Sequence, residues 1–191
     1  MPIPTFNAQG MLPPTIGNDP TTADRSPYHA TMPEFVQAFA TSIERKSLLR
    51  NLIAYRALIA TDGYERGYQF FDGSFVENVE VTRGRAPKDI DVFTMLHAPQ
   101  KYLDSFALWQ GPGFQFWSSE IADQKLNKER FSLDTYALLI EDAPLDRMLE
   151  QVMYWYSLFS HQRDTFAWKG FVAVSFDRAQ DDEALALIEA M

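Results

Sequence analysis

The chain has 191 residues, of which 46% are apolar and 14% aromatic, enough for one domain with a sizeable core. Its formal net charge of −9 disfavours broad binding to duplex DNA or to an anionic membrane surface. Cysteine is absent, which excludes disulfides and thiolate chemistry and suits a reducing compartment. There is neither an apolar run of membrane-spanning length nor the pattern of a signal peptide. We therefore expect a cytoplasmic protein with no membrane contact.

The N-terminal part of the chain is rich in proline. Seven of the 11 prolines lie within the first 33 residues, and residues 7–28 show no hydrophobic period. We interpret residues 1–30 as an arm. It is either a flexible leader or a segment that lies against the body or a second subunit, with Met11, Leu12 and Ile16 as its apolar contacts. Residues 31–191 are expected to form a single domain.

Helices and strands alternate through this domain. Thr31 with Glu34, and Thr41 with Glu44, have the spacing of capping boxes and predict two helices, the second closed by Asp62-Gly63. Apolar residues recur at helical spacing from Leu145 to Phe159, which predicts a helix packed on the core. A last helix is predicted over 181–190, and strands are predicted over 68–71, 89–95, 134–140 and 171–176. The predicted fold class is α/β (α+β), a mixed central sheet of about four strands flanked by helices.

Gly73-Ser74 directly follows the predicted strand 68–71. If a helix opens there, its free N–H groups and positive dipole end form an anion site. Glycine lets a phosphate approach the backbone closely, and Ser74 adds a hydroxyl donor. A Gly-Ser pair before a helix is common, so this signal is weak by itself.

Asp89-Ile90-Asp91 opens the next predicted strand. Residues i and i+2 of a strand share a face, so both carboxylates should point the same way with Ile90 on the other face. Two such charges repel each other unless a cation lies between or beside them, and hard carboxylate oxygens suit Mg²⁺ (or Mn²⁺). The alternative is a solvated turn in which Asp89 merely precedes the strand.

The order of these two features resembles the nucleotidyltransferase superfamily that includes polymerase-β-like enzymes. Its pattern is an apolar residue, Gly-Ser or Gly-Gly, a spacer, and then Asp-x-Asp. The spacer of 14 residues here is slightly longer than usual in that superfamily. A closer resemblance, to a small uncharacterised family of nucleotidyltransferase-like proteins from bacteria and phages, covers nearly the whole chain. It is carried by NAQGMLPP, EFVQAFATS, LIAYRALI, YQFFDGSFVE, PKDIDVFT and YWYSLFSHQRDTFAWKGFVAV.

The resemblance implies a minimal nucleotidyltransferase fold and a set of site residues. Gly73 and Ser74 would hold a triphosphate, while Asp89 and Asp91 would bind two magnesium ions together with a third carboxylate from a later strand. Asp134, which opens strand 134–140, is the favoured third carboxylate and a candidate general base. Its rivals, Glu141 and Asp142, fall at the opposite end of that strand.

Three basic residues, Arg83, Arg85 and Lys88, stand out in an acidic chain. They are candidate contacts for a triphosphate or a nucleic-acid acceptor. In the competing interpretation they only offset Glu77, Glu80 and Asp89 locally. Arg163 and Lys169 are further cations that could bind phosphate.

Two functions remain open from the sequence. The first is a metal-dependent nucleotidyltransferase that moves a nucleoside monophosphate from an NTP to an unknown acceptor, which is RNA, a protein or a small molecule. The second is a nucleotide-binding module without turnover of its own, such as an antitoxin or defence component, that works through a protein partner. A homo-oligomer is compatible with either function.

Overall fold

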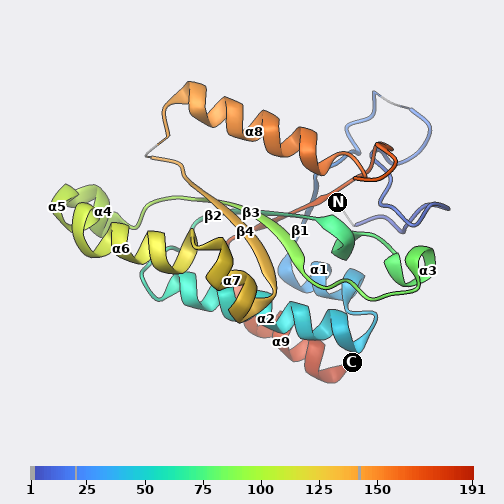
Figure 1. The fold of residues 1–191 in the computed structure, drawn as a ribbon, viewed down its shortest axis with the longest axis horizontal. Coiled ribbons are helices and arrows are strands. Elements are labelled where there is room, and N and C mark those ends of the chain that lie inside the picture. Colours follow the sequence, from blue (N-terminus) through green and yellow to red (C-terminus); the bar gives the residue numbers. More distant parts are fainter. Residues whose placement is uncertain (1–2, 20, 142) are drawn as a thin grey trace.

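A computed structural model describes residues 3–19, 21–141 and 143–191, built around one open, mixed sheet (Figure 1). Its strand order is β1 (Tyr28–Ala30), β5 (Val172–Ser175), β2 (Gly67–Asp72), β3 (Ile90–Leu96) and β4 (Leu133–Leu139). β1 is parallel to β5, and β3 is parallel to β4, while β2 runs antiparallel to both of its neighbours. The expected mixed sheet flanked by helices is confirmed. It has five strands because residues 28–30 also join it.

One face of the sheet carries most of the core. It is covered by α1 (Met32–Phe39), α2 (Ile43–Ala60), α7 (Gln124–Phe131) and α9 (Asp181–Ala190), which lie below the sheet in Figure 1. Phe35 of α1 stacks on Phe71 of β2 with the ring centroids 4.5 Å apart, and both rings are fully buried. Burial of such rings dominates the hydrophobic stabilisation of a domain of this size.

The caps of the first two helices follow from short polar side chains. Thr31 Oγ1 accepts a hydrogen bond from the Glu34 amide at 3.2 Å, and the Glu34 carboxylate accepts one from the Thr31 amide at 2.7 Å. This confirms the first capping box. The second prediction is wrong by one residue, because Ser42 rather than Thr41 caps α2 through its contact with the Arg45 amide.

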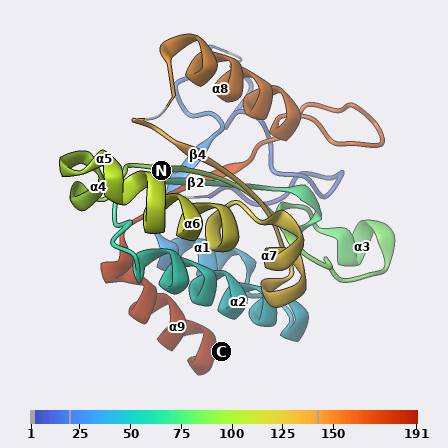
Figure 2. The same cartoon turned by 60° about the vertical axis from the view of Figure 1, so that its left-hand side comes forward.

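The other face of the sheet is covered by α8 (Leu145–Phe159), which lies apart from the remaining helices (Figures 1 and 2). Trp155 packs on the sheet, 4.9 Å from the Phe93 ring and 4.4 Å from the Tyr136 ring. The prediction that the whole apolar stripe packs in the core is wrong. Three of its members, Leu145, Leu149 and Met153, are more than half exposed. The reason is that the sheet receives only the Trp155 and Phe159 side of the helix.

A helical crossover joins the parallel strands β3 and β4, as such a connection requires. It comprises α4 (Gln100–Asp104), α5 (Phe106–Leu108), α6 (Phe114–Phe116), α7 and the π-helical turns η2 (Trp109–Gly113) and η3 (Trp117–Ile121). Three of its aromatic residues, Trp109, Phe116 and Trp117, pack around Tyr64 and Tyr102 at the end of the sheet away from the carboxylates described below. These aromatics therefore serve the core.

The N-terminal segment packs along the body. Leu12 is buried in the main core, and its carbonyl accepts a hydrogen bond from the Gly170 amide at 2.8 Å. The Gly10 carbonyl accepts one from the Asn78 amide at 2.7 Å. Met11 is buried as well, whereas Ile16 is exposed. None of the helices in the described part of the chain is long and apolar enough to cross a membrane.

A buried arginine ties α2 to α9 and to the sheet. The Arg56 guanidinium is fully buried and contacts both carboxylate oxygens of Asp181 at 3.0 Å and the Gln69 amide oxygen at 2.7 Å. It also donates to the Ser175 and Asp177 carbonyls at 3.2 Å. Removing one partner of such a pair leaves the other charge buried and unpaired.

We therefore expect Arg56→Met to lower the free energy of unfolding by about 3–5 kcal/mol. The measurement is urea denaturation. Arg50→Met is the matched control, because Arg50 joins the same two helices through an exposed ion pair with Glu189 at 2.8 Å. The control should change stability by less than about 1 kcal/mol. Equal losses in both variants would contradict the role given to burial.

Candidate functional site

Three carboxylates line up across adjacent strands at one end of the sheet. Asp72 ends β2 and is paired in register with Asp91 of β3, and Asp91 is paired with Asp134 of β4. Side chains directly opposite each other on neighbouring strands lie on the same face, with Cβ atoms about 5 Å apart. The strand register thus gathers three negative charges in a row.

The alternation of β3 places this row on the face covered by α8. Ile90 and Val92 are fully buried in the main core below the sheet. Asp91 and Phe93 point to the opposite face, where Phe93 stacks on Trp155. Ile90 therefore lies on the other face from Asp91, as the strand pattern predicts.

A lysine stands between two of the carboxylates. Lys128, near the end of α7, forms a close ion pair with Asp89 and a second with Asp134 at 3.5 Å between Nζ and Oδ2. The Lys128 ammonium therefore neutralises part of the negative charge that gathers beside Asp91. β3 begins at Ile90, so Asp89 precedes the strand instead of opening it, but it lines the same cavity as Asp91.

Two of the three aligned carboxyl groups have raised pKa values. Burial, together with the neighbouring Asp89 and Asp134 charges, raises the pKa of Asp91 from 3.8 to about 6. Burial also raises the pKa of Asp72 to about 7, although the Lys169 ammonium acts in the opposite direction. Strongly perturbed carboxyl groups of this kind are concentrated at functional sites.

The Gly73-Ser74 turn lies against this row. It forms a single 3-10 turn, η1 (Gly73–Val76), rather than the opening of an α-helix, so the expected helix dipole at this position is wrong. Gly73 has φ +73°, and a Cβ at this residue would overlap the Asp91 carboxylate. Glycine is required here because the backbone of the turn touches the acidic side chain directly.

Arg45 of α2 holds the turn from behind. Its buried guanidinium donates to the Phe75 and Glu77 carbonyls, each at 2.6 Å, and forms an ion pair with Glu80 at 2.6 Å. The backbone after Gly73 is therefore fixed by a charged group that is itself held by packing. The short helix α3 (Val79–Arg83) follows directly.

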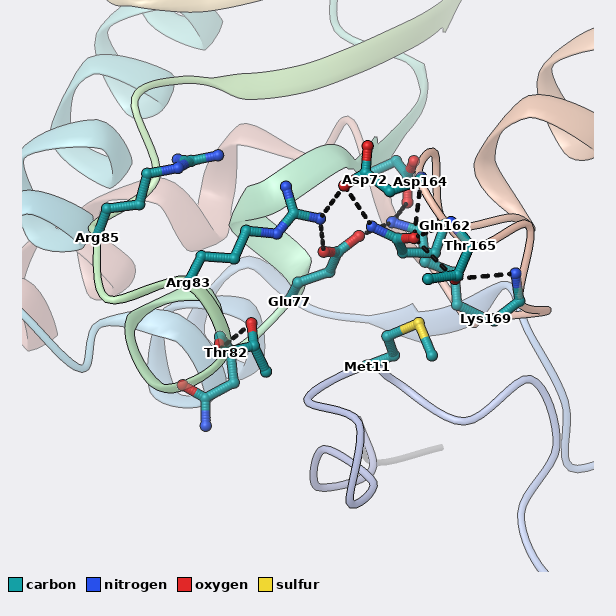
Figure 3. A network of polar contacts seen from close by, with 12 residues as sticks. Met11, Asp72, Glu77, Thr82, Arg83, Arg85, Gln162, Asp164, Thr165 and Lys169 are labelled. Atoms are coloured by element: carbon teal, nitrogen blue, oxygen red, sulfur yellow. Dashed lines mark hydrogen bonds and ion pairs between the residues drawn. The ribbon is translucent and has the colours of Figure 1, made fainter.

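A second charge network covers the other side of Asp72 (Figure 3). The buried Lys169 ammonium contacts Asp72 at 2.9 Å and Glu77 at 2.8 Å. Arg83 reaches the same Glu77 at 3.3 Å and Asp164 at 3.1 Å. Lys169 thereby joins the segment before β5 to the turn that follows β2.

These groups surround one cavity of about 680 Å³. Every site residue expected from the sequence lines it, namely Gly73, Ser74, Arg83, Arg85, Lys88, Asp89, Asp91 and Asp134. The interpretation in which the three basic residues only offset nearby acidic residues is met by Arg83 and Glu77, but Glu80 and Asp89 have other partners. Arg83 offsets Glu77, whereas Glu80 is paired with Arg45 and Asp89 with Lys128.

One rival for the third carboxylate, Glu141, does not line the cavity. Glu141 lies past the far end of β4, where it contacts His97 Nδ1 at 2.7 Å and accepts a hydrogen bond from the Ala98 amide at 2.8 Å. Asp142 falls outside the described residues. The structure thus places Asp134 beside Asp91 and Glu141 elsewhere.

Sequence reasoning missed several members of the site. Asp72 adjoins Gly73, and its register with Asp91 needed the pairing of two antiparallel strands to be known. Lys128 comes from a helix that the sequence pattern did not predict. Arg163 and Lys169 were recognised as cations, but nothing in the sequence placed them at the cavity.

The oxygen donors nearest to a metal-binding arrangement are Asp89, Asp91 and Asp134. In the described part of the chain, no three His, Cys, Asp or Glu side chains lie close enough together to hold a metal ion. The Lys128 ammonium is paired with two of these carboxylates and supplies the positive charge beside them. The chemistry of the donor set, three hard carboxylates at one edge, fits a magnesium ion.

The fold and the site define a mixed α/β protein with an acidic cavity at one end of an open sheet. Residues 4–175 match the model of a family described as a family of unknown function, DUF6932, and the chain belongs to that family. No curated protein and no solved structure matches the chain.

The raised pKa of Asp91 gives a prediction for stability. Because the folded-state pKa of about 6 exceeds the ordinary value of 3.8, the folded protein binds the proton more tightly. The unfavourable contribution of the Asp91 charge is absent below about pH 4, grows as pH rises, and is complete above about pH 6. We expect Asp91→Asn to raise the free energy of unfolding by about 1–3 kcal/mol at pH 8 and by little at pH 4.

The measurement is denaturation of both proteins with EDTA present, and the difference between them isolates the contribution of Asp91. A variant less stable than wild type at pH 8 would show that the carboxylate helps to hold the fold.

Proposed function

We propose that the protein is a magnesium-dependent nucleotidyltransferase that transfers a nucleoside monophosphate from an NTP to an acceptor hydroxyl. The acceptor class, RNA, a protein or a small molecule, is open. The observation that carries the proposal is the register of Asp91 with Asp134, with Asp89 two residues before Asp91 and the Gly73 turn in contact with the Asp91 carboxylate. The order of the two motifs along the sequence is a separate line of support.

The carboxylates support a divalent cation in this cavity. Burial and, after it, the neighbouring Asp89 and Asp134 charges raise the pKa of Asp91, and a cation beside these carboxylates would offset both effects. Magnesium ions held by Asp89, Asp91 and Asp134 would lower the pKa of an acceptor hydroxyl and stabilise negative charge on the phosphates. Manganese, with the same preference for oxygen, would serve as well.

The residues of the chain supply positioning and proton transfer. The Gly73-Ser74 turn offers backbone and hydroxyl donors to the phosphates, and Arg83, Arg85 and Lys88 add positive charge along the same wall. The acceptor oxygen attacks the α-phosphorus, the bond to the bridging oxygen of the β-phosphate breaks, and pyrophosphate leaves. Asp134 accepts the proton of the acceptor hydroxyl. As in other phosphoryl transfers, catalysis rests on positioning and electrostatic stabilisation.

A second function, a nucleotide-binding module that acts through a protein partner such as a toxin or another defence component, is favoured by α8. This helix keeps Leu145, Leu149 and Met153 largely exposed. Exposed apolar residues gathered on one helix are typical of a surface that meets another protein. In this case the cavity would bind an NTP without turning it over.

Measuring the turnover of NTP distinguishes the two proposed functions. We expect wild type with Mg²⁺ to release pyrophosphate from at least one NTP when the acceptor is present in a cell extract. Asp89→Asn and Asp91→Asn should each lower the rate by at least about 100-fold while the circular dichroism stays unchanged. Glu141→Gln is the control, because that carboxylate lies at the far end of β4.

Binding of an NTP without release of pyrophosphate would favour the partner module. Turnover that survives in both aspartate variants would refute the assignment.

Lys128 gives a second prediction, for metal binding alone. Because its ammonium is paired with Asp89 and Asp134, a divalent cation must displace it. We expect Lys128→Met to raise the affinity for Mn²⁺ by up to about tenfold, measured by isothermal titration calorimetry without nucleotide. Lys125→Met, an exposed lysine on the same helix, should leave the affinity unchanged. A lower affinity in Lys128→Met than in wild type would contradict displacement.

A further inference from the structure

The loop that follows α8 is held closed by backbone hydrogen bonds. The Gln162 amide donates to the Ala167 carbonyl at 2.9 Å, and the Lys169 amide donates to the Ser160 carbonyl at 2.8 Å. His161 and Trp168 form an isolated bridge between these contacts. Residues 160–169, here called the cavity loop, are thus an ordered element that supplies several residues of the cavity wall.

One buried side chain organises the interior of the cavity loop. Gln162 is almost fully buried, and its Oε1 atom accepts hydrogen bonds from the Thr165 amide at 2.7 Å and the Thr165 hydroxyl at 2.8 Å. The Asp164 amide donates to the same atom at 2.9 Å. Figure 3 shows Gln162 and Thr165 side by side next to Asp164. The conformation of the loop is therefore set from within rather than by its exposed residues.

Phe166 lies at the exposed tip of this loop in an unusual backbone conformation. Its φ is +56°, in the left-handed region that bulky side chains rarely adopt, and its side chain is 79% exposed. The Phe166 amide donates to the Gln162 carbonyl at 2.8 Å, which fixes this geometry. The loop accepts backbone strain while leaving a large apolar ring in water. Strain that the surroundings hold in place in this way is typical of ligand-binding positions.

The cavity that Phe166 lines combines charged side chains with aromatic ones. Phe166 and Arg163 line the same cavity as Asp91 and the Gly73 turn. Arg83 anchors the loop to the opposite wall through Asp164 at 3.1 Å. An exposed aromatic ring, an arginine and a glycine turn that line one cavity are the features that a base attached to a polyphosphate would need.

We propose that Phe166 is a stacking platform for the nucleobase of the nucleotide that binds in this cavity, and that the cavity loop exists to present it. The inference rests on the proposed function and makes it more specific. It assigns the substrate class as nucleoside polyphosphates, recognised through the base as well as through the phosphates. Since every base has a π-face, stacking alone accepts all four bases.

The test compares four nucleoside triphosphates with tripolyphosphate, which carries the phosphates without a base. Binding of ATP, GTP, CTP and UTP, and of inorganic tripolyphosphate, is measured by isothermal titration calorimetry with Mg²⁺. We expect Phe166→Ala to weaken NTP binding by about 5- to 100-fold and to leave tripolyphosphate binding unchanged. Phe166→Trp should restore NTP binding. Phe106→Ala removes an exposed ring from α5, away from the cavity lining, and is the matched control.

A second variant separates stacking from a structural role. Phe166→Gly removes the ring and relieves the positive φ, so its melting temperature should equal or exceed that of wild type while NTP binding is weakened. A lower melting temperature together with lost binding would mean that the ring holds the loop, and would overturn the proposal. Unchanged NTP binding in Phe166→Ala would overturn it too. If wild type binds neither NTP nor tripolyphosphate, the proposed function itself fails.

Discussion

The repulsion among carboxylates gathered at one end of the sheet is the constraint on which the site depends. Asp72, Asp91 and Asp134 occupy matching positions on three neighbouring strands, so the pairing that builds the sheet also brings like charges together. The protein offsets this with two lysines, Lys169 beside Asp72 and Lys128 beside Asp134. Lys169 lies far along the chain from Asp72, and Lys128 lies far from Asp89, its other partner, so these ion pairs form only when the helices and strands have packed together.

The two lysines differ in burial, and this difference separates two tasks. Lys169 is enclosed with Asp72 and Glu77, which makes it a permanent part of the framework beneath the glycine turn. Lys128 is 42% exposed and reaches its partners from the last turn of α7, which is why we propose that a divalent cation can displace it. Asp91 therefore lies between a carboxylate paired with a buried lysine, Asp72, and one paired with an exposed lysine, Asp134.

The sequence predicted the residue types of the site better than its surroundings. Strand alternation was enough to put Asp91 and Ile90 on opposite faces of the sheet, because a period of two residues is a local property. The pairing of Asp72 with Asp91 depends on which strands become neighbours, which no local pattern determines. The apolar stripe of α8 was misjudged for a related reason: periodicity identifies the helix, but the number of elements packed on it decides how much of the stripe is buried.

The N-terminal segment links both walls of the cavity. Gly10 accepts a hydrogen bond from Asn78, just after the glycine turn, and Leu12 accepts one from Gly170, just after the cavity loop. Residues 10–12 thus connect the segment after the glycine turn to the segment after the cavity loop through backbone hydrogen bonds. Removing the residues ahead of residue 14 would therefore not yield a smaller version of the same domain, since it would remove the backbone hydrogen bonds that hold the two cavity walls in position relative to each other.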